Sequence, residues 1–150
     1  MRLRDFIEPS AVSLDLHAPT KDAVLDELIT LLHLDERATG TLARLLRRRE
    51  ALGSTGVGRG IAIPHCRSLE VKRLRLAFGV HKPGVEYDAI DGRPVHVFFL
   101  IVAPPVEVAN QYLQVLGSIA KFAQQSDVAD RLKTLTNPDQ LLALLDERGA

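Results

Sequence analysis

The sequence has no tryptophan, a single cysteine and no net charge, and these scarcities exclude several classes of protein. With one cysteine, Cys66, in 150 residues, the chain cannot form an internal disulfide and is not a disulfide-built miniprotein. Because 19 basic residues balance 19 acidic ones, there is no overall field to hold nucleic acid or an anionic membrane. We therefore expect no nucleic-acid partner.

Long apolar runs are also missing. The longest one, residues 95–102, is interrupted by His96 and is far shorter than the roughly 20 apolar residues of a membrane-spanning helix. Charged residues, instead of an apolar signal segment, follow Met1. We therefore expect a cytoplasmic protein without direct membrane insertion. We also expect a single domain over residues 1–150, with a core from about residue 3 to residue 147.

Hydrophobic periodicity predicts strands mixed with helices. The expected strands cover residues 12–16, 74–80 and 95–102, with turns at residues 82–84 and 91–94. The expected helices begin after the cap Thr20, at about Glu36, at about Val106 and at the pair Asn137-Pro138. The strand at 95–102 is apolar on both faces, so it should be central. The predicted fold class is α/β, a single-domain sandwich with a central mixed β-sheet flanked by helices on both sides.

The second expected helix, at about residues 36–52, contains three consecutive arginines that helical geometry separates. Leu42 and Leu46 share one apolar face. Arg49 continues that face, whereas Arg47 and Arg48 point away from it as solvated charges. Arg49 either snorkels past the edge of the core or faces a functional site, and periodicity alone leaves both interpretations open.

Four glycines lie within residues 53–60, directly after this helix. Glycine allows backbone N–H groups to approach a bound anion closely. Gly53 and Gly58 have the spacing of a nucleotide-binding P-loop, but Arg59-Gly60 follow where that motif requires lysine and then serine or threonine. The dinucleotide-binding fingerprint fails as well, because its glycine register is wrong and no helix follows. Nucleotide binding is therefore disfavoured.

Other catalytic or metal-binding arrangements find no support in the residues. His65 and Cys66 are adjacent in an extended segment, so their side chains should point to opposite faces and cannot act readily as base and nucleophile. The five histidines form no helical pair or close ligand cluster, so we expect no metal site. Asp88 and Asp91 lie among turn residues. Taken alone, a single histidine such as His65 is more often a satisfied structural residue than a chemical one.

The segment from Gly53 to His65 resembles the active-site signature of the fructose/mannitol family of phosphotransferase-system enzyme IIA domains, including the nitrogen-regulatory branch. Thirteen contiguous residues ending in Ile63-Pro64-His65 carry this resemblance, which extends through residues 3–16, residues 87–94 and the final helices. In that family, the histidine of this segment accepts a phosphoryl group, and an arginine sixteen residues earlier accompanies it. The resemblance thus implies His65 as the acceptor and Arg49 as its companion.

The resemblance also implies a mechanism that needs no cofactor beyond the phosphoryl group carried on His65. The expected phosphate-binding residues are Ser54, Thr55 and Gly56, through hydroxyl and backbone N–H groups. Many relatives carry a second histidine, followed by leucine, near the start of the long helix, where this chain has Tyr112-Leu113. Tyr112 can donate a hydrogen bond but carries no positive charge, and it also falls on the apolar helix face, so a site contact and a core role both stay open.

The implied donor is a histidine phosphocarrier protein of the HPr/NPr type, and the implied acceptor is a sugar-specific IIB domain or a regulatory protein. We expect a phosphotransferase component that does not turn over a small substrate on its own. The alternative is a regulatory binding module that works without phosphorylation. The end of the chain at Ala150, with no fused downstream carrier domain, favours this alternative.

Overall fold

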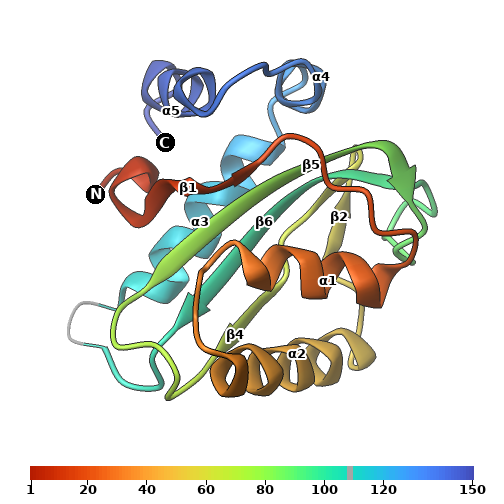
Figure 1. Ribbon diagram of the computed structural model, residues 1–150. Helices are drawn as coiled ribbons and strands as arrows, with labels where there is room; N and C mark the ends of the chain where they lie inside the picture. The colour runs from red at the N-terminus through yellow and green to blue at the C-terminus, as the bar shows by residue number, and fades with distance from the viewer. Residues whose placement is uncertain (108–109) are drawn as a thin grey trace.

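The computed structural model describes residues 1–107 and 110–150 and has a six-stranded mixed sheet at its centre (Figure 1). The strands are β1 (Ile7–Ser13), β2 (Gly56–Gly58), β3 (Ile61–Ala62), β4 (His65–Arg67), β5 (Arg75–Val85) and β6 (Val95–Ala103). Their order is β1-β5-β6-β3-β2, and β4 pairs with β6 further along that strand. Strand β6 is antiparallel to β5 and parallel to β3 and β4, which confirms the prediction of a mixed sheet.

Strand β6 lies in the middle of the sheet because its side chains are apolar on both faces. Every residue of β6 except His96 is buried. Alternate residues enter two separate cores, with Phe98, Leu100 and Val102 on one side and Val97, Phe99 and Ile101 on the other. This period of two is that of a strand covered on both faces, as predicted.

Helices cover both faces of the sheet, which confirms the predicted sandwich (Figure 1). The helices on one face are α1 (Lys21–Thr30) and α2 (Glu36–Ala51). Those on the other face are α3 (Gln111–Ala123), α4 (Val128–Lys133) and α5 (Pro138–Glu147), together with the 3-10 turn η1 (Leu3–Phe6). No helix among residues 1–107 and 110–150 is long and apolar enough to span a membrane.

Two of the helices begin at the caps that the sequence predicts. The Thr20 hydroxyl accepts the N–H of Ala23 at 3.2 Å, and the Asn137 side chain accepts the N–H of Gln140 at 3.1 Å. Each cap satisfies one of the backbone donors left open at a helix N-terminus. Pro138 follows at the start of α5, where its missing N–H costs nothing.

The first strand lies earlier in the chain than the predicted residues 12–16. Strand β1 ends at Ser13, because the chain then crosses from one face of the sheet to the other. Leu14 packs against the core under α3, α4 and α5, whereas Leu16 is buried in the core under α1 and α2. Pro9 is tolerated inside β1 because β1 is an edge strand with one open side.

The turn predicted at residues 82–84 is also wrong. These residues form an irregularity inside β5, where the pairing with β6 shifts between Val80 and Val85. Gly84 has a φ of +85° there, and a Cβ at this position would lie 2.6 Å from a ring carbon of His96. The chain reverses later, where the N–H of Gly92 donates to Ala89 O at 2.9 Å, in a turn that begins before the predicted residues 91–94 and overlaps them.

The helix predicted from about Val106 begins later, at Gln111, after Asn110 with a φ of +51°. Residues 108–109, which this prediction included, lie outside the described residues. The short helix α4 was not predicted at all, and it is fastened to the core by Val128 and Leu132.

Candidate functional site

His65 opens the short strand β4, which pairs with β6 next to the point where α2 ends. It is half-buried, and its neighbour Cys66 is buried in the core under α1 and α2. The two side chains therefore leave the strand on opposite faces, as expected from the sequence. Burial raises the pKa of the Cys66 thiol to about 12, so Cys66 is not a thiolate nucleophile at neutral pH.

The imidazole of His65 is held by the backbone. Its Nδ1 lies 2.7 Å from Ile63 O, so Nδ1 carries the proton that it donates to this carbonyl. The pKa of His65 is lowered from 6.5, chiefly by burial and further by the positive charge of Arg49. At neutral pH the ring is therefore neutral, and the lone pair belongs to Nε2.

Arg49 lies in the last turn of α2 and is half-buried, whereas Arg47 and Arg48 are exposed. Its Nη1 donates to Gly53 O at 2.9 Å, which ties the helix end to the glycine segment. Arg47 instead pairs with Asp26 at 2.7 Å on the outer surface. Helical periodicity thus correctly predicted that Arg49 is the half-buried one of the three arginines, although the exposed Arg48 also reaches the site.

A shallow hollow of about 440 Å³ surrounds the imidazole, bounded by the end of α2, strand β4 and the start of α3. Its lining consists of Leu45, Arg48, Arg49, Leu52, His65, Cys66, Arg67, Tyr112, Leu113 and Leu116. Leu52 and Leu113 are 83% and 58% exposed, so the rim is apolar and accessible. Among the described residues, the lining contains three arginines and no acidic residue, an arrangement that suits an approaching anionic group.

Tyr112 is a buried residue whose ring lies beside the imidazole of His65. Its ring centroid lies 6.0 Å from that of His65, and burial raises the pKa of its hydroxyl to about 12. The guanidinium of Arg67 lies 4.3 Å from the same ring centroid. Tyr112 therefore packs in the core and also lines the hollow.

Arg67 is a site residue that sequence reasoning missed. It lies two residues after His65 in β4, on the same face of the strand. Its Nη1 donates to Pro104 O at 3.0 Å and to the carboxylate of Glu107 at 3.3 Å. The strand period of two, applied to His65, was the signal that could have identified it.

The three expected phosphate-binding residues do not line the hollow around His65. The Ser54 hydroxyl donates to Tyr87 O at 2.8 Å and accepts the N–H of Gly56 at 3.1 Å. Thr55 is buried, and both its N–H and its hydroxyl donate to the carboxylate of Glu50. These groups make contacts within the protein and hold the glycine segment in place.

Glu50 was also missed, although it is the acidic residue directly after Arg49. Its side chain is only 3% exposed and forms an ion pair with Lys21 at 3.0 Å. The signal was spacing, because Leu42, Leu46 and Glu50 lie four residues apart on the buried face of α2.

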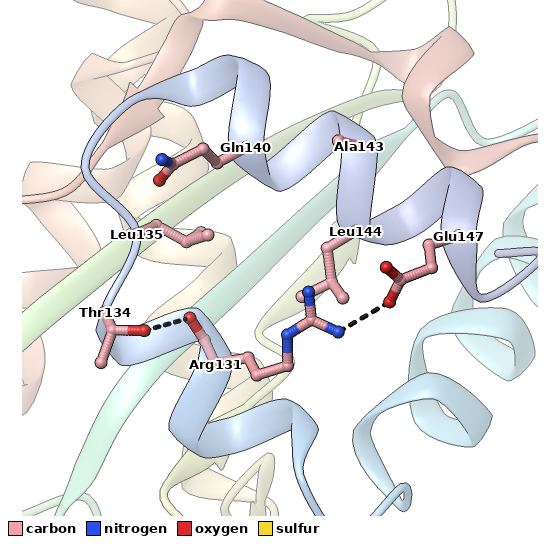
Figure 2. A pocket seen from close by; sticks show the side chains of 7 residues that line it. All are labelled: Arg131, Thr134, Leu135, Gln140, Ala143, Leu144 and Glu147. Atoms are coloured by element: carbon pink, nitrogen blue, oxygen red, sulfur yellow. Dashed lines mark hydrogen bonds and ion pairs between the residues drawn. The ribbon is translucent and has the colours of Figure 1, made fainter.

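A second hollow, of about 370 Å³, lies between α4 and α5 (Figure 2). Its charged side chains satisfy each other, since Arg131 pairs with Glu147 at 2.6 Å. The Thr134 hydroxyl donates to Arg131 O at 3.0 Å. We therefore place the candidate site at His65. Within the described part of the chain, no group of His, Cys, Asp and Glu is arranged to hold a metal ion.

The arrangement of sheet and helices is that of solved enzyme IIA domains. Nitrogen regulatory protein IIA-Ntr from Neisseria meningitidis matches with a TM-score of 0.85 and 30% identity, over 94% of this chain and 97% of that one. The mannitol enzyme IIA from Escherichia coli has the same fold, with a TM-score of 0.73 and 22% identity over 92% of this chain and 97% of that one.

The chain belongs to the EIIA 2 family of the phosphoenolpyruvate-dependent sugar phosphotransferase system, whose sequence model matches residues 5–148. A nitrogen regulatory protein of Pseudomonas aeruginosa is 32% identical over 97% of this chain and 95% of its own length. A fructose-specific EIIABC component of Bacillus subtilis is 30% identical over 98% of this chain, but the chain spans only 23% of that protein. The resemblance inferred from the sequence is thereby confirmed.

Proposed function

We propose that Nε2 of His65 accepts a phosphoryl group from the phosphohistidine of a histidine phosphocarrier protein. The observation that carries this proposal is the 2.7 Å hydrogen bond from Nδ1 to Ile63 O, which leaves the Nε2 lone pair of a neutral ring as the nucleophile. A neutral imidazole beside fixed positive charge is suited to attack phosphorus without further activation. Enzyme IIA domains are phosphotransferase components, and the proposed chemistry agrees with that class.

In the proposed step, the Nε2 lone pair forms a bond to phosphorus as the bond from phosphorus to the donor nitrogen breaks. The donor imidazole, protonated at its other ring nitrogen, leaves as a neutral ring with the electron pair of the broken bond, and His65 keeps the Nδ1 proton that it donates to Ile63 O. Catalysis of such a transfer consists mainly of positioning and of stabilising charge on the equatorial phosphoryl oxygens. Arg49 and Arg67, which line the same hollow as His65, are the cations that we assign to those oxygens.

The phosphoryl group would leave by the same face that it entered, because the hollow is shallow and both partners must reach Nε2. The acceptor is a sugar-specific IIB domain or a regulatory target. A IIB acceptor is supported by the Escherichia coli mannitol enzyme IIA, which shares this fold and has been solved in a complex with phosphorylated enzyme IIB. A regulatory target is supported by the full-length match to nitrogen regulatory proteins.

The test is to incubate the protein with phosphoenolpyruvate, enzyme I and the phosphocarrier, and to measure intact mass. One acid-labile phosphoryl group should appear in the wild type and in His17→Ala, a control at a histidine whose side chain is 83% exposed. It should be lost in His65→Ala. An unmodified wild-type mass would contradict the proposal and favour the second candidate.

That second candidate is a regulatory module that binds its partner without being phosphorylated. It is favoured by Tyr112, which stands where many relatives have a second histidine and cannot supply a positive charge. Binding of a regulatory partner with equal affinity to wild type and His65→Ala, in the absence of phosphorylation, would support it. Recovery of a IIB domain that then became phosphorylated would reject it.

A further inference from the structure

Behind the site lies a buried polar cluster built around the carboxylate of Glu50. The N–H of Thr55 donates to this carboxylate at 3.1 Å, and the Thr55 hydroxyl donates to its other oxygen. Lys21, at the start of α1, forms an ion pair with it at 3.0 Å. A carboxylate this deeply buried is costly unless such partners satisfy it, so its position is closely fixed.

Tyr87 closes the cluster from the other side. Because the single proton of the Thr55 hydroxyl goes to Glu50, the Tyr87 hydroxyl is the donor in its 3.1 Å contact with Thr55. Burial raises the pKa of Tyr87, so this proton is retained. Lys21 also donates to Tyr87 O at 3.3 Å and lies 4.4 Å from the ring centroid. The cluster thus joins α1, the end of α2, the glycine segment and residue 87.

Hydrogen bonds lead from this cluster to the imidazole. Thr55, which Glu50 holds at two atoms, accepts the N–H of Ile63 at its carbonyl with a distance of 3.0 Å. The carbonyl of Ile63 in turn accepts Nδ1–H of His65 at 2.7 Å. The backbones of Thr55 and Ile63 thus connect the Glu50 carboxylate to Nδ1 of His65 through a series of hydrogen bonds.

A second connection leads to Arg49. Glu50 is the next residue in α2, and Arg49 donates to Gly53 O at 2.9 Å, two residues before Thr55. Two hydrogen bonds therefore hold the segment from residue 49 to residue 55. One runs from Arg49 to Gly53 O, and the other runs from the N–H of Thr55 to the Glu50 carboxylate. Two of the groups that we assign to the phosphoryl transfer, His65 and Arg49, are therefore held by segments that contact Glu50 or adjoin it in the chain.

We propose that Glu50 is a positioning residue, which acts through Thr55 and Ile63 to fix the Nδ1–H tautomer of His65 and to hold Arg49 beside it. The effect on transfer rate rests on the proposed phosphoryl transfer, whereas the effect on the tautomer does not. Misplacement of a reacting group by a fraction of an ångström slows a step that depends on positioning. Glu50 itself lies behind the hollow and does not line it.

The experiment compares Glu50→Gln, Thr55→Val and Thr55→Ser with the wild type. The control is Glu27→Gln, because the Glu27 carboxylate also accepts backbone N–H groups, from His17 at 3.1 Å and Ala18 at 2.9 Å. Long-range proton–nitrogen NMR of the histidine rings above neutral pH reports the tautomer of His65. Phosphorylation assays at varied donor concentration give kcat and KM, and thermal melting gives Tm.

The wild type, Thr55→Ser and Glu27→Gln should keep the Nδ1–H tautomer and a normal kcat. Glu50→Gln and Thr55→Val should show a mixture of both tautomers and about a tenfold lower kcat, with KM unchanged because the docking face is intact. Thr55→Ser restores the hydroxyl, so it tests whether the hydrogen bond, and not the volume of the side chain, is responsible.

Lower Tm with wild-type tautomer and kcat in Glu50→Gln and Thr55→Val would mean that the cluster only stabilises the fold, and would overturn the proposal. If Glu50→Gln does not fold, the Thr55→Val and Thr55→Ser pair decides. A wild-type protein that is never phosphorylated would reject the proposed function, while the tautomer comparison would still decide the positioning role of Glu50.

Discussion

At the scale of single residues, a backbone carbonyl selects the nucleophilic nitrogen of His65. A side-chain partner could rotate away. Ile63 O, by contrast, is a backbone atom of a residue whose own N–H already donates to Thr55 O. The tautomer is therefore set when the segment folds, before any phosphoryl donor arrives. Little reorganisation remains for the transfer itself.

The first prediction concerns the titration of His65. Its pKa should be measured below 6.5, because burial disfavours the imidazolium and Arg49 adds repulsion, against the hydrogen bond to Ile63 and the charge of Glu50. Phosphoryl acceptance should persist as the pH falls through 6.5 and decline only near the lowered pKa. NMR titration of the ring protons measures the pKa of His65. His17 is the internal control, since its hydrogen bond to Asp15 O and the charge of Glu27 raise its pKa.

The lowered pKa of His65 also affects the free energy of unfolding. Between 6.5 and the lower folded pKa, the unfolded chain binds a proton at His65 that the folded chain does not. This group therefore makes the fold less stable as the pH falls through that interval, and its contribution stays constant above it. A His65 midpoint above that of His17 would contradict both expectations.

The second prediction is that Arg49→Lys leaves Tm nearly unchanged but slows phosphorylation. The planar guanidinium can bind Gly53 O through Nη1 and still direct other N–H groups toward phosphoryl oxygens, which one ammonium group does not reproduce. The rate is measured with the phosphorylated donor. Arg47→Lys, in the same run of arginines but paired with Asp26 on the surface, is the control. Equal rates in both variants would make Arg49 a structural residue only.

At the scale of the elements, close approach between β5 and α1 depends on Gly79. A Cβ on Gly79 would lie 2.9 Å from Cγ of Leu16 and 3.1 Å from Cδ2 of Leu28, both of them fully buried. Gly117 in α3 offers the opposite case, since among the described residues no atom beyond its chain neighbours and the backbone of its own helix lies within 4 Å of a Cβ built there. The two glycines therefore form a matched pair of sites for substitution.

The third prediction follows from this pair. Gly79→Ala should lower the free energy of unfolding by about 1–3 kcal/mol, because packed core side chains must shift. Gly117→Ala should raise it by about 0.5–1 kcal/mol, because alanine is the better helix former and meets no obstacle. Chemical denaturation of both variants measures the two effects. A stabilising Gly79→Ala would show that Leu16 and Leu28 have room to move.

Elements whose signals are local could be predicted from the sequence, and those that depend on distant partners could not. Thr20 and Asn137 cap helices through residues three positions away, and both predictions hold. The hydrogen bonds of Thr55, in contrast, involve Tyr87, 32 residues later, as well as Glu50. The glycine segment therefore indicated anion binding through Ser54, Thr55 and Gly56, whereas in the fold these residues bind other parts of the protein.

At the scale of the whole molecule, the hollow around His65 brings together three segments that are far apart in the chain. Helix α2, strand β4 and helix α3 each contribute to it, and each supplies apolar or basic side chains. Periodicity could place Arg49 and Tyr112 on the correct helix faces, but only the pairing of β4 with β6 places both beside His65. The third cation, Arg67, shares a strand face with His65, but its place in the hollow depends on that arrangement.

The chain has no net charge, yet the described lining of this hollow has three arginines and no acidic residue, and only Arg67 among them pairs with a carboxylate, that of Glu107. This local charge should attract a phosphorylated donor from a distance. A phosphoryl group on His65 adds about −1.5 to −2 charges and would offset much of it. The released donor would then be attracted less strongly, which would favour its exchange for the next partner.

The fourth prediction tests this attraction. Values of kcat/KM for the phosphorylated donor should fall severalfold as salt rises from low to physiological concentration, because the Debye length shrinks to about 8 Å. Arg48→Ala should flatten this dependence and leave kcat unchanged, since Arg48 lies exposed on the rim, whereas His65 and Arg49 are half-buried. Arg44→Ala, exposed on the same helix outside the hollow, should keep the wild-type slope. A kcat/KM independent of salt, or equal slopes in the two variants, would mean that apolar contacts at Leu52 and Leu113 govern docking instead.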